Sequence, residues 1–343
     1  MVRHLLCCLL VLASFATVSA GEPNGKYLRA GIIGCDTSHV VAFTKMLNNP
    51  KAPPHLAGIK VVAAFPGGST DIHYNYGGKQ INGEQRANMY ANTLKTTYKV
   101  ELVKSIEQLL EKVDVVLLES HDGRKHLKQL IPVLKAGKPV FIDKPVAGSL
   151  ADTLEIFKLA QKYKVPLFSS SSLRFCPNMA GMRNDDKVGK VMGCAAFSPC
   201  SKEAHHPDLY WYGIHGVEVL FTIMGPGCET VTRVEAPNYE LVVGKWKDGR
   251  IGTFRGLRGG KAGYGALVYG SKGIRQSGPY TGYEGLVTEI VKFFKTGRPP
   301  VSAEETIQIY AFMEAADESK RNGGQPVSIA SVIAKAEKKL IRK

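Results

Sequence analysis

Cysteine is sparse in this sequence and follows no pattern. Of its seven cysteines, Cys7 and Cys8 lie inside an apolar N-terminal stretch, and no two cysteines have the C-x-x-C spacing. The other five are scattered and odd in number, so a disulfide framework or a cysteine-based metal or redox motif is not indicated. One disulfide is possible, and at least one thiol should be free. These five cysteines are Cys35, Cys176, Cys194, Cys200 and Cys228.

Other features are missing as well. We find no internal repeat and no low-complexity tract, and beyond the first twenty residues no apolar run approaches the ~20 residues that span a bilayer. The formal net charge is +15, but the lysines are spread along the chain and no nucleic-acid recognition motif accompanies them. A basic surface concentrates acidic ligands. We therefore expect no nucleic acid partner and no membrane span, and we expect a small-molecule or glycan substrate that could be acidic.

The first twenty residues have the pattern of a signal peptide. Arg3 and His4 form a short basic segment, an apolar stretch follows, and Val18-Ser19-Ala20 supplies small residues before Gly21. No twin-arginine pair is present, which favours general secretion. The sequence therefore predicts an exported protein, either periplasmic or extracellular, with residues 1–20 removed.

The N-terminal half alternates apolar runs with amphipathic segments, the pattern of parallel βαβ units. The resulting prediction is a Rossmann-type doubly wound parallel sheet over residues 27–172, in which residues 66–83, rich in glycine, asparagine and tyrosine, form a long loop. The strands are expected at 27–33, 59–65, 113–118, 139–142 and 166–169, and the helices at 38–47, 105–112, 124–136 and 150–163.

After Arg174 the pattern changes to short alternating segments broken by glycine and lysine, which is typical of an antiparallel sheet with one solvated face. Residues 173–343 are therefore predicted to form an α+β domain with a large, mostly antiparallel open sheet that binds substrate or another subunit. The strands are expected at 191–197, 230–235, 239–246, 252–257 and 266–269, and the helices at 214–223, 283–296 and 303–322.

The segment Gly31 to His39 stands where a Rossmann fold places its phosphate-binding turn. The usual fingerprint is G-x-G-x-x-G, but here only the first of its glycines, Gly34, is present; Asp36 takes the second position and His39 the third. A carboxylate ~4 Å from a phosphate costs about 4 kcal/mol at an effective dielectric near 20. Alternatively, Asp36 turns away and caps the helix, leaving Thr37, Ser38 and the helix N-terminus to contact phosphate.

The acidic residue that binds the ribose in many dinucleotide sites is also absent. Phe65-Pro66-Gly67-Gly68-Ser69 follows the second strand, and Asp71 is the nearest carboxylate. Both expected contacts with a dinucleotide are thus weakened, although the glycine-rich turn with Ser69 could hold a phosphate through its backbone amides.

Several motifs, in order along the chain, resemble the Gfo/Idh/MocA family of oxidoreductases. Asp143-Lys144-Pro145 at a strand end resembles the family's Glu-Lys-Pro signature, and the segment 113–126 resembles its strand–loop–helix unit. The segments 173–177, 212–218 and 296–300 also match, and the turn at 36–39 marks a divergent branch. The resemblance implies an oxidoreductase that uses NAD or NADP and forms a homo-oligomer.

The same resemblance implies roles for particular residues. Lys144 and His215 would be the catalytic acid–base groups. The family's aspartate four positions before the histidine is replaced here by Trp211, which would suit a wall that stacks on a sugar. Other residues would line the cofactor or the substrate. For the cofactor these are Gly34, Asp36, Thr37, Ser38, His39, Ser120, His121, Asp143 and Lys144, and for the substrate Arg174, Tyr210, Trp211 and Tyr212.

Several interpretations remain open. His205, His206 and Asp208 could suit zinc, but with no second spaced pair we favour a polar loop over the site and expect no metal. Three functions are compatible with these residues. The first is an oxidoreductase that acts on a sugar, sugar acid or cyclitol hydroxyl, the second a lyase or glycosidase that uses tightly bound NAD internally, and the third an exported carbohydrate-binding protein without catalysis.

Overall fold

The computed structural model describes residues 27–341, so the predicted signal peptide lies outside the described residues. The N-terminal domain is built on a six-stranded parallel sheet of order β5-β2-β1-β6-β7-β8, the strand order of a Rossmann fold. Its strands are β1 (Leu28–Ile33), β2 (Ile59–Phe65), β5 (Glu101–Leu102), β6 (Val115–Leu118), β7 (Val140–Ile142) and β8 (Leu167–Ser169). Its helices are α1 (His39–Leu47), α2 (Gly83–Tyr98), α3 (Ile106–Leu110), α4 (His126–Lys135) and α5 (Leu150–Tyr163).

Both faces of this sheet are covered, because successive residues of a strand point to opposite faces. In β1, Ile33 belongs to the apolar cluster formed with α3, α4 and α5, while Ile32 belongs to the cluster formed with α1 and α2. Apolar side chains on both sides of the central strands therefore fix the sheet in the middle of a three-layer domain. The predicted fold of this domain is confirmed.

The second domain carries a seven-stranded sheet of order β14-β13-β9-β12-β11-β10-β15. All pairs that include β10, β11 or β13 are antiparallel, and β9 and β12 run parallel. The strands are β9 (Val191–Pro199), β10 (Cys228–Ala236), β11 (Tyr239–Trp246), β12 (Ile251–Leu257), β13 (Gly265–Gly270), β14 (Ile274–Gln276) and β15 (Val327–Ser328). The helices are α6 (Pro177–Ala180), α7 (Asp208–Trp211), α8 (Ile214–Met224), α9 (Glu284–Thr296), α10 (Ala303–Arg321) and α11 (Ile329–Ile341).

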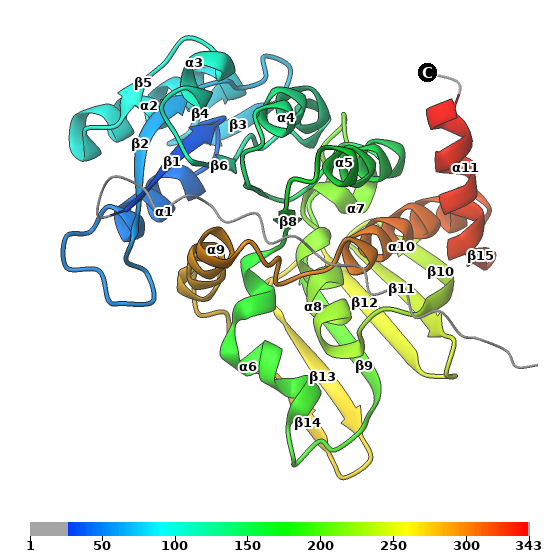
Figure 1. Ribbon diagram of the computed structural model, residues 1–343. Coiled ribbons are helices and arrows are strands. Elements are labelled where there is room, and N and C mark those ends of the chain that lie inside the picture. Colours follow the sequence, from blue (N-terminus) through cyan, green and yellow to red (C-terminus); the bar gives the residue numbers. More distant parts are fainter. Residues whose placement is uncertain (1–26, 342–343) are drawn as a thin grey trace, which may run out of the picture.

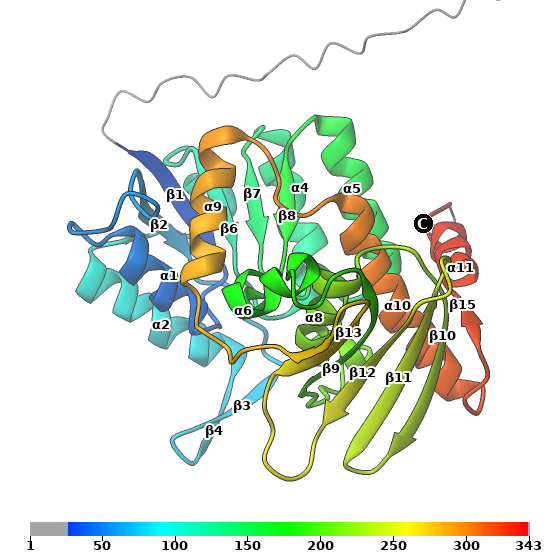
Figure 2. The same cartoon turned by 90° about the horizontal axis from the view of Figure 1, so that it is seen from below.

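The two domains are tied together by helices from the C-terminal half. Helix α9 packs Leu286 and Phe293 into the apolar cluster of the first domain, where Phe293 meets Phe168 of β8, and Figure 2 shows α9 alongside the first sheet. Figure 1 shows α10 between α5 and the second sheet. The sequence boundary at residue 173 therefore does not separate the two cores.

Residues 66–83 do not form one long loop, contrary to the sequence interpretation. They contain a two-stranded hairpin of β3 (His73–Tyr76) and β4 (Lys79–Asn82), closed by Gly77 and Gly78, both with positive φ. Helix α2 follows at once and begins with a capping box between Asn82 and Gln85. Figure 2 shows this hairpin projecting away from the first sheet.

The five cysteines of the described residues are all free and buried. Within residues 27–341, no helix combines the length and the apolar character that crossing a bilayer requires.

Candidate functional site

The turn after β1 has the backbone geometry of a phosphate-binding turn. Gly34 has a φ of +85°, and a Cβ at this position would lie 2.5 Å or less from Ser120, so only glycine fits. Helix α1 begins directly afterwards, and its N-cap residue Ser38 makes no side-chain capping hydrogen bond. The first N–H groups of a helix have no intrahelical partner and attract anions. The turn therefore suits the phosphates of a dinucleotide.

Asp36 neither caps this helix nor points outward, so its interpretation as a helix cap is wrong. The carboxylate is fully buried, and its Oδ1 accepts a hydrogen bond of 2.9 Å from the backbone N–H of His121. Its Oδ2 has no hydrogen-bond partner among the described residues. Burial raises the pKa of Asp36 to about 6. The carboxylate thus joins the turn to the β6–α4 loop.

The chain after β2 offers no acid for a ribose, as the sequence indicates. Asp71 forms an ion pair with Arg124 at 2.9 Å, and the Ser69 hydroxyl donates to Asp122 at 2.6 Å. The Ser69 hydroxyl hydrogen is therefore used within the protein. The phosphates of a dinucleotide would therefore be held by Gly34, Thr37, Ser38 and the start of α1. Its ribose would have no carboxylate contact.

Lys144 and His215 approach the same aromatic side chain from different domains. Lys144 follows β7, is 4% exposed, and places its Nζ 5.6 Å from the centre of the Tyr212 ring. His215, in α8, has its ring centre 4.9 Å from that of Tyr212, and its Nδ1 lies 2.7 Å from the Ser171 hydroxyl. The fold thus brings the two predicted catalytic groups together around Tyr212.

Burial lowers the pKa of both groups. It lowers the pKa of Lys144, although the negative charge of Asp143 opposes this effect. It also lowers the pKa of His215 to well below its usual value, with a further contribution from the positive charges of Lys144 and His39. A neutral imidazole held through Nδ1 leaves Nε2 to exchange a proton with a bound hydroxyl.

Three tyrosines that were not predicted from the sequence, Tyr264, Tyr280 and Tyr283, extend the aromatic surface around Tyr212. The Tyr212 and Tyr264 hydroxyls lie 3.0 Å apart, and the Tyr280 hydroxyl lies 3.2 Å from that of Ser172. Tyr283 is next to Tyr280, and its ring packs edge-on against His39 with the ring centres 4.8 Å apart. These tyrosines come from loops after β12 and β14, where local pattern gave no signal for them.

A second aromatic group connects the hairpin to helix α7 of the second domain. The Trp211 ring lies 4.2 Å from that of His121, and the Tyr74 hydroxyl of β3 lies 2.9 Å from His121 Nδ1. The Arg86 guanidinium stacks over the Tyr74 ring at 4.2 Å. Trp211 is thus buried in this group with its ring packed on His121, and its role in sugar stacking stays a prediction.

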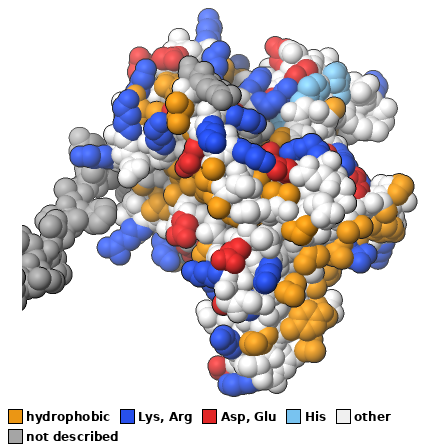
Figure 3. Space-filling view, turned by 90° about the vertical axis from the view of Figure 1, so that its right-hand side faces the viewer, with side chains coloured by type: hydrophobic (Ala, Val, Ile, Leu, Met, Phe, Trp, Pro, Cys, Tyr) orange, Lys and Arg blue, Asp and Glu red, His pale blue; other side chains and the backbone are white. Residues whose placement is uncertain are grey.

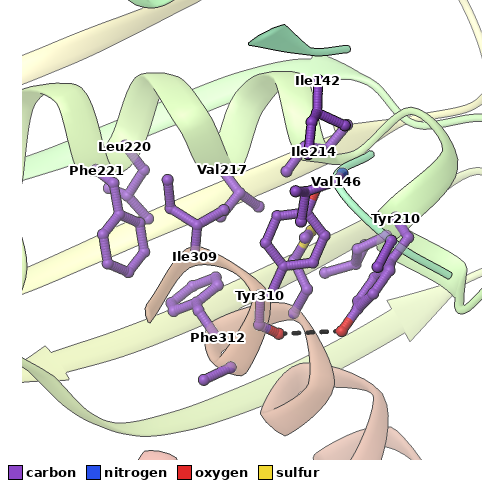
Figure 4. Packing of buried hydrophobic residues seen from close by; sticks show 14 of the residues in the cluster. Ile142, Val146, Tyr210, Ile214, Val217, Leu220, Phe221, Ile309, Tyr310 and Phe312 are labelled. Atoms are coloured by element: carbon purple, nitrogen blue, oxygen red, sulfur yellow. Dashed lines mark hydrogen bonds between the residues drawn. The ribbon is translucent and has the colours of Figure 1, made fainter. Parts of the chain in front are cut away.

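Two residues predicted to contact substrate lie elsewhere. Tyr210 is fully buried, and its hydroxyl donates to the backbone carbonyl of Tyr310 at 3.4 Å (Figure 4). In the short helix α7 its side chain points into the core, so it cannot form a substrate wall. Arg174 is 8% exposed and forms ion pairs with Glu218 and with Glu305, the latter at 2.8 Å. Its charge is therefore already compensated within the protein.

The histidine pair connects the two domains. The His206 side chain is fully buried, with Nδ1 2.8 Å from Glu203 and Nε2 3.2 Å from Asp122 of the first domain. His205 lies 2.7 Å from the same glutamate. This arrangement agrees with the polar loop favoured from the sequence, in which both histidines pair with carboxylates of the protein.

Comparison with known proteins agrees with this geometry. Residues 82–171 match the model of the Gfo/Idh/MocA oxidoreductase family, described as having an NAD-binding Rossmann fold. No curated protein matches the sequence. The resemblance to the Gfo/Idh/MocA oxidoreductases predicted from the sequence is confirmed for this segment of the first domain.

Solved structures share the fold over nearly the whole chain. A probable dehydrogenase from Thermotoga maritima is 21% identical with a TM-score of 0.70, covering 89% of this chain and 100% of its own. A myo-inositol 2-dehydrogenase from Lactobacillus plantarum is 16% identical with a TM-score of 0.70, covering 88% and 99%. An oxidoreductase from Agrobacterium radiobacter, in complex with NAD+, L-tartaric acid and magnesium, is 15% identical with a TM-score of 0.68, covering 89% and 99%.

Proposed function

We propose that this protein is an NAD(P)-dependent oxidoreductase that acts on a hydroxyl-bearing carbon of a sugar, sugar acid or cyclitol. The observation that carries the proposal is the convergence of Lys144 and His215 on Tyr212, next to a turn whose backbone suits a dinucleotide. Tyrosine hydroxyls and ring faces suit a polyhydroxylated ring, because such a ring has both polar edges and apolar faces. The inositol dehydrogenase among the structural neighbours supports the same substrate class.

Lys144, His215 and the tyrosines have different roles in this proposal. When bound, a nicotinamide supplies the acceptor or donor of a hydride. Lys144 Nζ binds the oxygen of the reacting hydroxyl and holds or transfers its proton. His215, oriented by the Ser171 hydroxyl at 2.7 Å, binds the same or the adjacent hydroxyl through Nε2. The tyrosines exclude water and hold the ring against these two groups.

The direct test is turnover of a panel of cyclitols, aldoses and sugar acids with NAD and NADP, followed by absorbance of the reduced nicotinamide. Lys144→Ala should lower kcat by about 10²–10⁴-fold, the contribution typical of a positioned acid–base group. Lys158→Ala is the matched control, because that side chain is 72% exposed on the same domain, and it should leave kcat unchanged. Full activity of Lys144→Ala would refute the role of this lysine.

We also propose that the protein self-associates through the open face of the second sheet. Alternate residues of its strands leave large apolar side chains uncovered, with Val234 65% and Ile251 55% exposed. Leu267 and Tyr269 of β13 point to this same side. Figure 3 shows apolar side chains gathered on the lower part of the face in view. Contiguous exposed apolar surface is typical of protein interfaces.

Export is the remaining part of the proposal. It is supported by the basic start, apolar stretch and small residues of positions 1–20. Sequencing the N-terminus of the protein recovered outside the cytoplasm should give Gly21 as the first residue. An intact Met1 on that material would contradict the predicted cleavage.

A further inference from the structure

Glu119 stands out among the described residues near the site because no hydrogen bond compensates the burial of its carboxyl group. It follows β6, its side chain is fully buried, and neither carboxylate oxygen has a hydrogen-bond partner among the residues that the structure describes. Burial and the neighbouring Asp143 charge raise the pKa of Glu119 well above its usual value. A buried carboxylate that makes no polar contact is costly unless a cation or a proton compensates it.

Two other groups point at the same place. Asp143, at the end of the adjacent strand β7, is 1% exposed; its Oδ1 accepts from its following backbone N–H and its Oδ2 lies 2.7 Å from His39 Nδ1. One ligand atom from each of His39, Glu119 and Asp143 lies within 4.8 Å of the others. The three residues come from the start of α1 and the ends of β6 and β7, so the rigid sheet fixes their spacing.

This donor set matches a divalent transition-metal ion. Zinc binds imidazole nitrogen and carboxylate oxygen at about 2.0–2.2 Å, and three protein ligands with one open position are typical of its catalytic sites. Tetrahedral ligands at such bond lengths lie about 3.4 Å apart. Because the present separations are 4.8 Å or less, small side-chain rotations would bring the three ligand atoms onto one ion.

We propose that His39, Glu119 and Asp143 bind one divalent transition-metal cation, with zinc as the best match, at the carboxyl edge of the first sheet. His39 occupies the position of the third glycine of the fingerprint, and glycine has no side chain that could serve as a ligand. Lys144 follows Asp143 directly, so the cation lies beside the proposed catalytic lysine, and its open position suits an oxygen of the substrate. The metal site does not depend on the proposed hydride transfer.

The test is metal binding by the purified full-length protein after treatment with a chelator and without dinucleotide. Zn²⁺ is titrated calorimetrically, and Co²⁺ is followed by its visible absorption, which reports the ligand geometry. We expect one equivalent to bind, and Glu119→Gln and His39→Gln to weaken binding by more than about tenfold each, since even outer-shell changes cost 10–100-fold. Glu203→Gln, which alters the other imidazole–carboxylate cluster at His205 and His206, is the matched control and should bind normally.

Two results would overturn the proposal. One is no saturable binding of either ion by the unaltered protein, which would leave Glu119 as a protonated acid next to Asp143. The other is binding that survives Glu119→Gln and His39→Gln but is lost in Glu203→Gln, which would place the ion at the histidine pair. Circular dichroism of the metal-free variants checks that they fold, and Glu119→Gln should fold well because it removes a buried charge. NADH titration in parallel separates the two proposals, because metal binding without dinucleotide binding would refute only the oxidoreductase.

Discussion

Asp36 gives the most quantitative prediction, because its environment is simple. The carboxylate is buried, accepts a backbone hydrogen bond from His121 and forms no ion pair with the residues that the structure describes, and burial outweighs the nearby charges of Lys125 and Arg86 to raise its pKa from 3.8 to about 6. A shift of about 2 units corresponds to about 3 kcal/mol of free energy. In the folded protein the carboxyl group holds its proton more tightly than in the unfolded chain. The free energy of unfolding should therefore fall as the pH rises from about 4 through 6, and remain low above it.

Asp36→Asn removes this titration while keeping an oxygen for the His121 N–H. The amide nitrogen lacks a partner at any pH, which costs about 1–3 kcal/mol. The informative quantity is therefore how the stability difference between variant and parent changes with pH. Chemical denaturation at about pH 4.5 and about pH 8 should show the variant gaining about 2 kcal/mol relative to the parent at the higher pH.

The control for this experiment is Asp71→Asn. The hydrogen bond with Arg124 lowers the pKa of Asp71 from 3.8, so its stabilising charge is already present at about pH 4.5, and the stability difference between that variant and the parent should be nearly the same at the two pH values. An equal stability difference for Asp36→Asn at the two pH values would show that Asp36 is not a buried, uncompensated acid, and would refute the reasoning about the turn.

Three further predictions follow from the packing. Arg174→Met leaves Glu218 and Glu305 without their partner and should lower the free energy of unfolding by about 3–5 kcal/mol. The KM for substrate should stay unchanged. A raised KM with full stability would show that Arg174 contacts the substrate after all. Val234→Glu combined with Ile251→Lys should convert the proposed oligomer to a monomer, as measured by light scattering. An unchanged molecular mass would show that this face of the sheet is not the interface. Tyr74→Phe should destabilise the hairpin by about 1 kcal/mol and speed its proteolysis; an unchanged rate would show that the bond to His121 does not hold it.

Helices and strands were predicted best from the sequence where the pattern of apolar residues or a helix cap was unambiguous. The strand Ile59–Phe65 and the helix Leu150–Tyr163 have the predicted bounds, because a run of buried apolar residues forms the first and Ser149 caps the second. Helix α2 was missed because its buried face consists mainly of small residues such as Ala87 and Ala91, which give a weak hydrophobic period. The Gly77-Gly78 turn is a recognised hairpin signal, but glycine-rich composition favoured a loop.

The residues of the site were predicted only where a short local motif contains them. Lys144 and His215 stand in short motifs and can be identified one at a time, but their meeting at Tyr212 depends on how the domains pack. The contact between His39 and Asp143 joins residues 104 positions apart, and no local pattern reports such a contact. Tyr210 was misplaced because neighbouring residues of the short helix α7 face different ways, and only packing decides which of them enters the apolar core.

The central claim is that the altered turn still binds a nicotinamide dinucleotide. The most direct measurement is calorimetric titration of the purified protein with NADH and NADPH, together with mass spectrometry of small molecules released on denaturation. We predict saturable binding of one dinucleotide per chain, or its release in equal amount from the protein as purified. The absence of both bound and titrating dinucleotide would contradict the assignment as a working oxidoreductase.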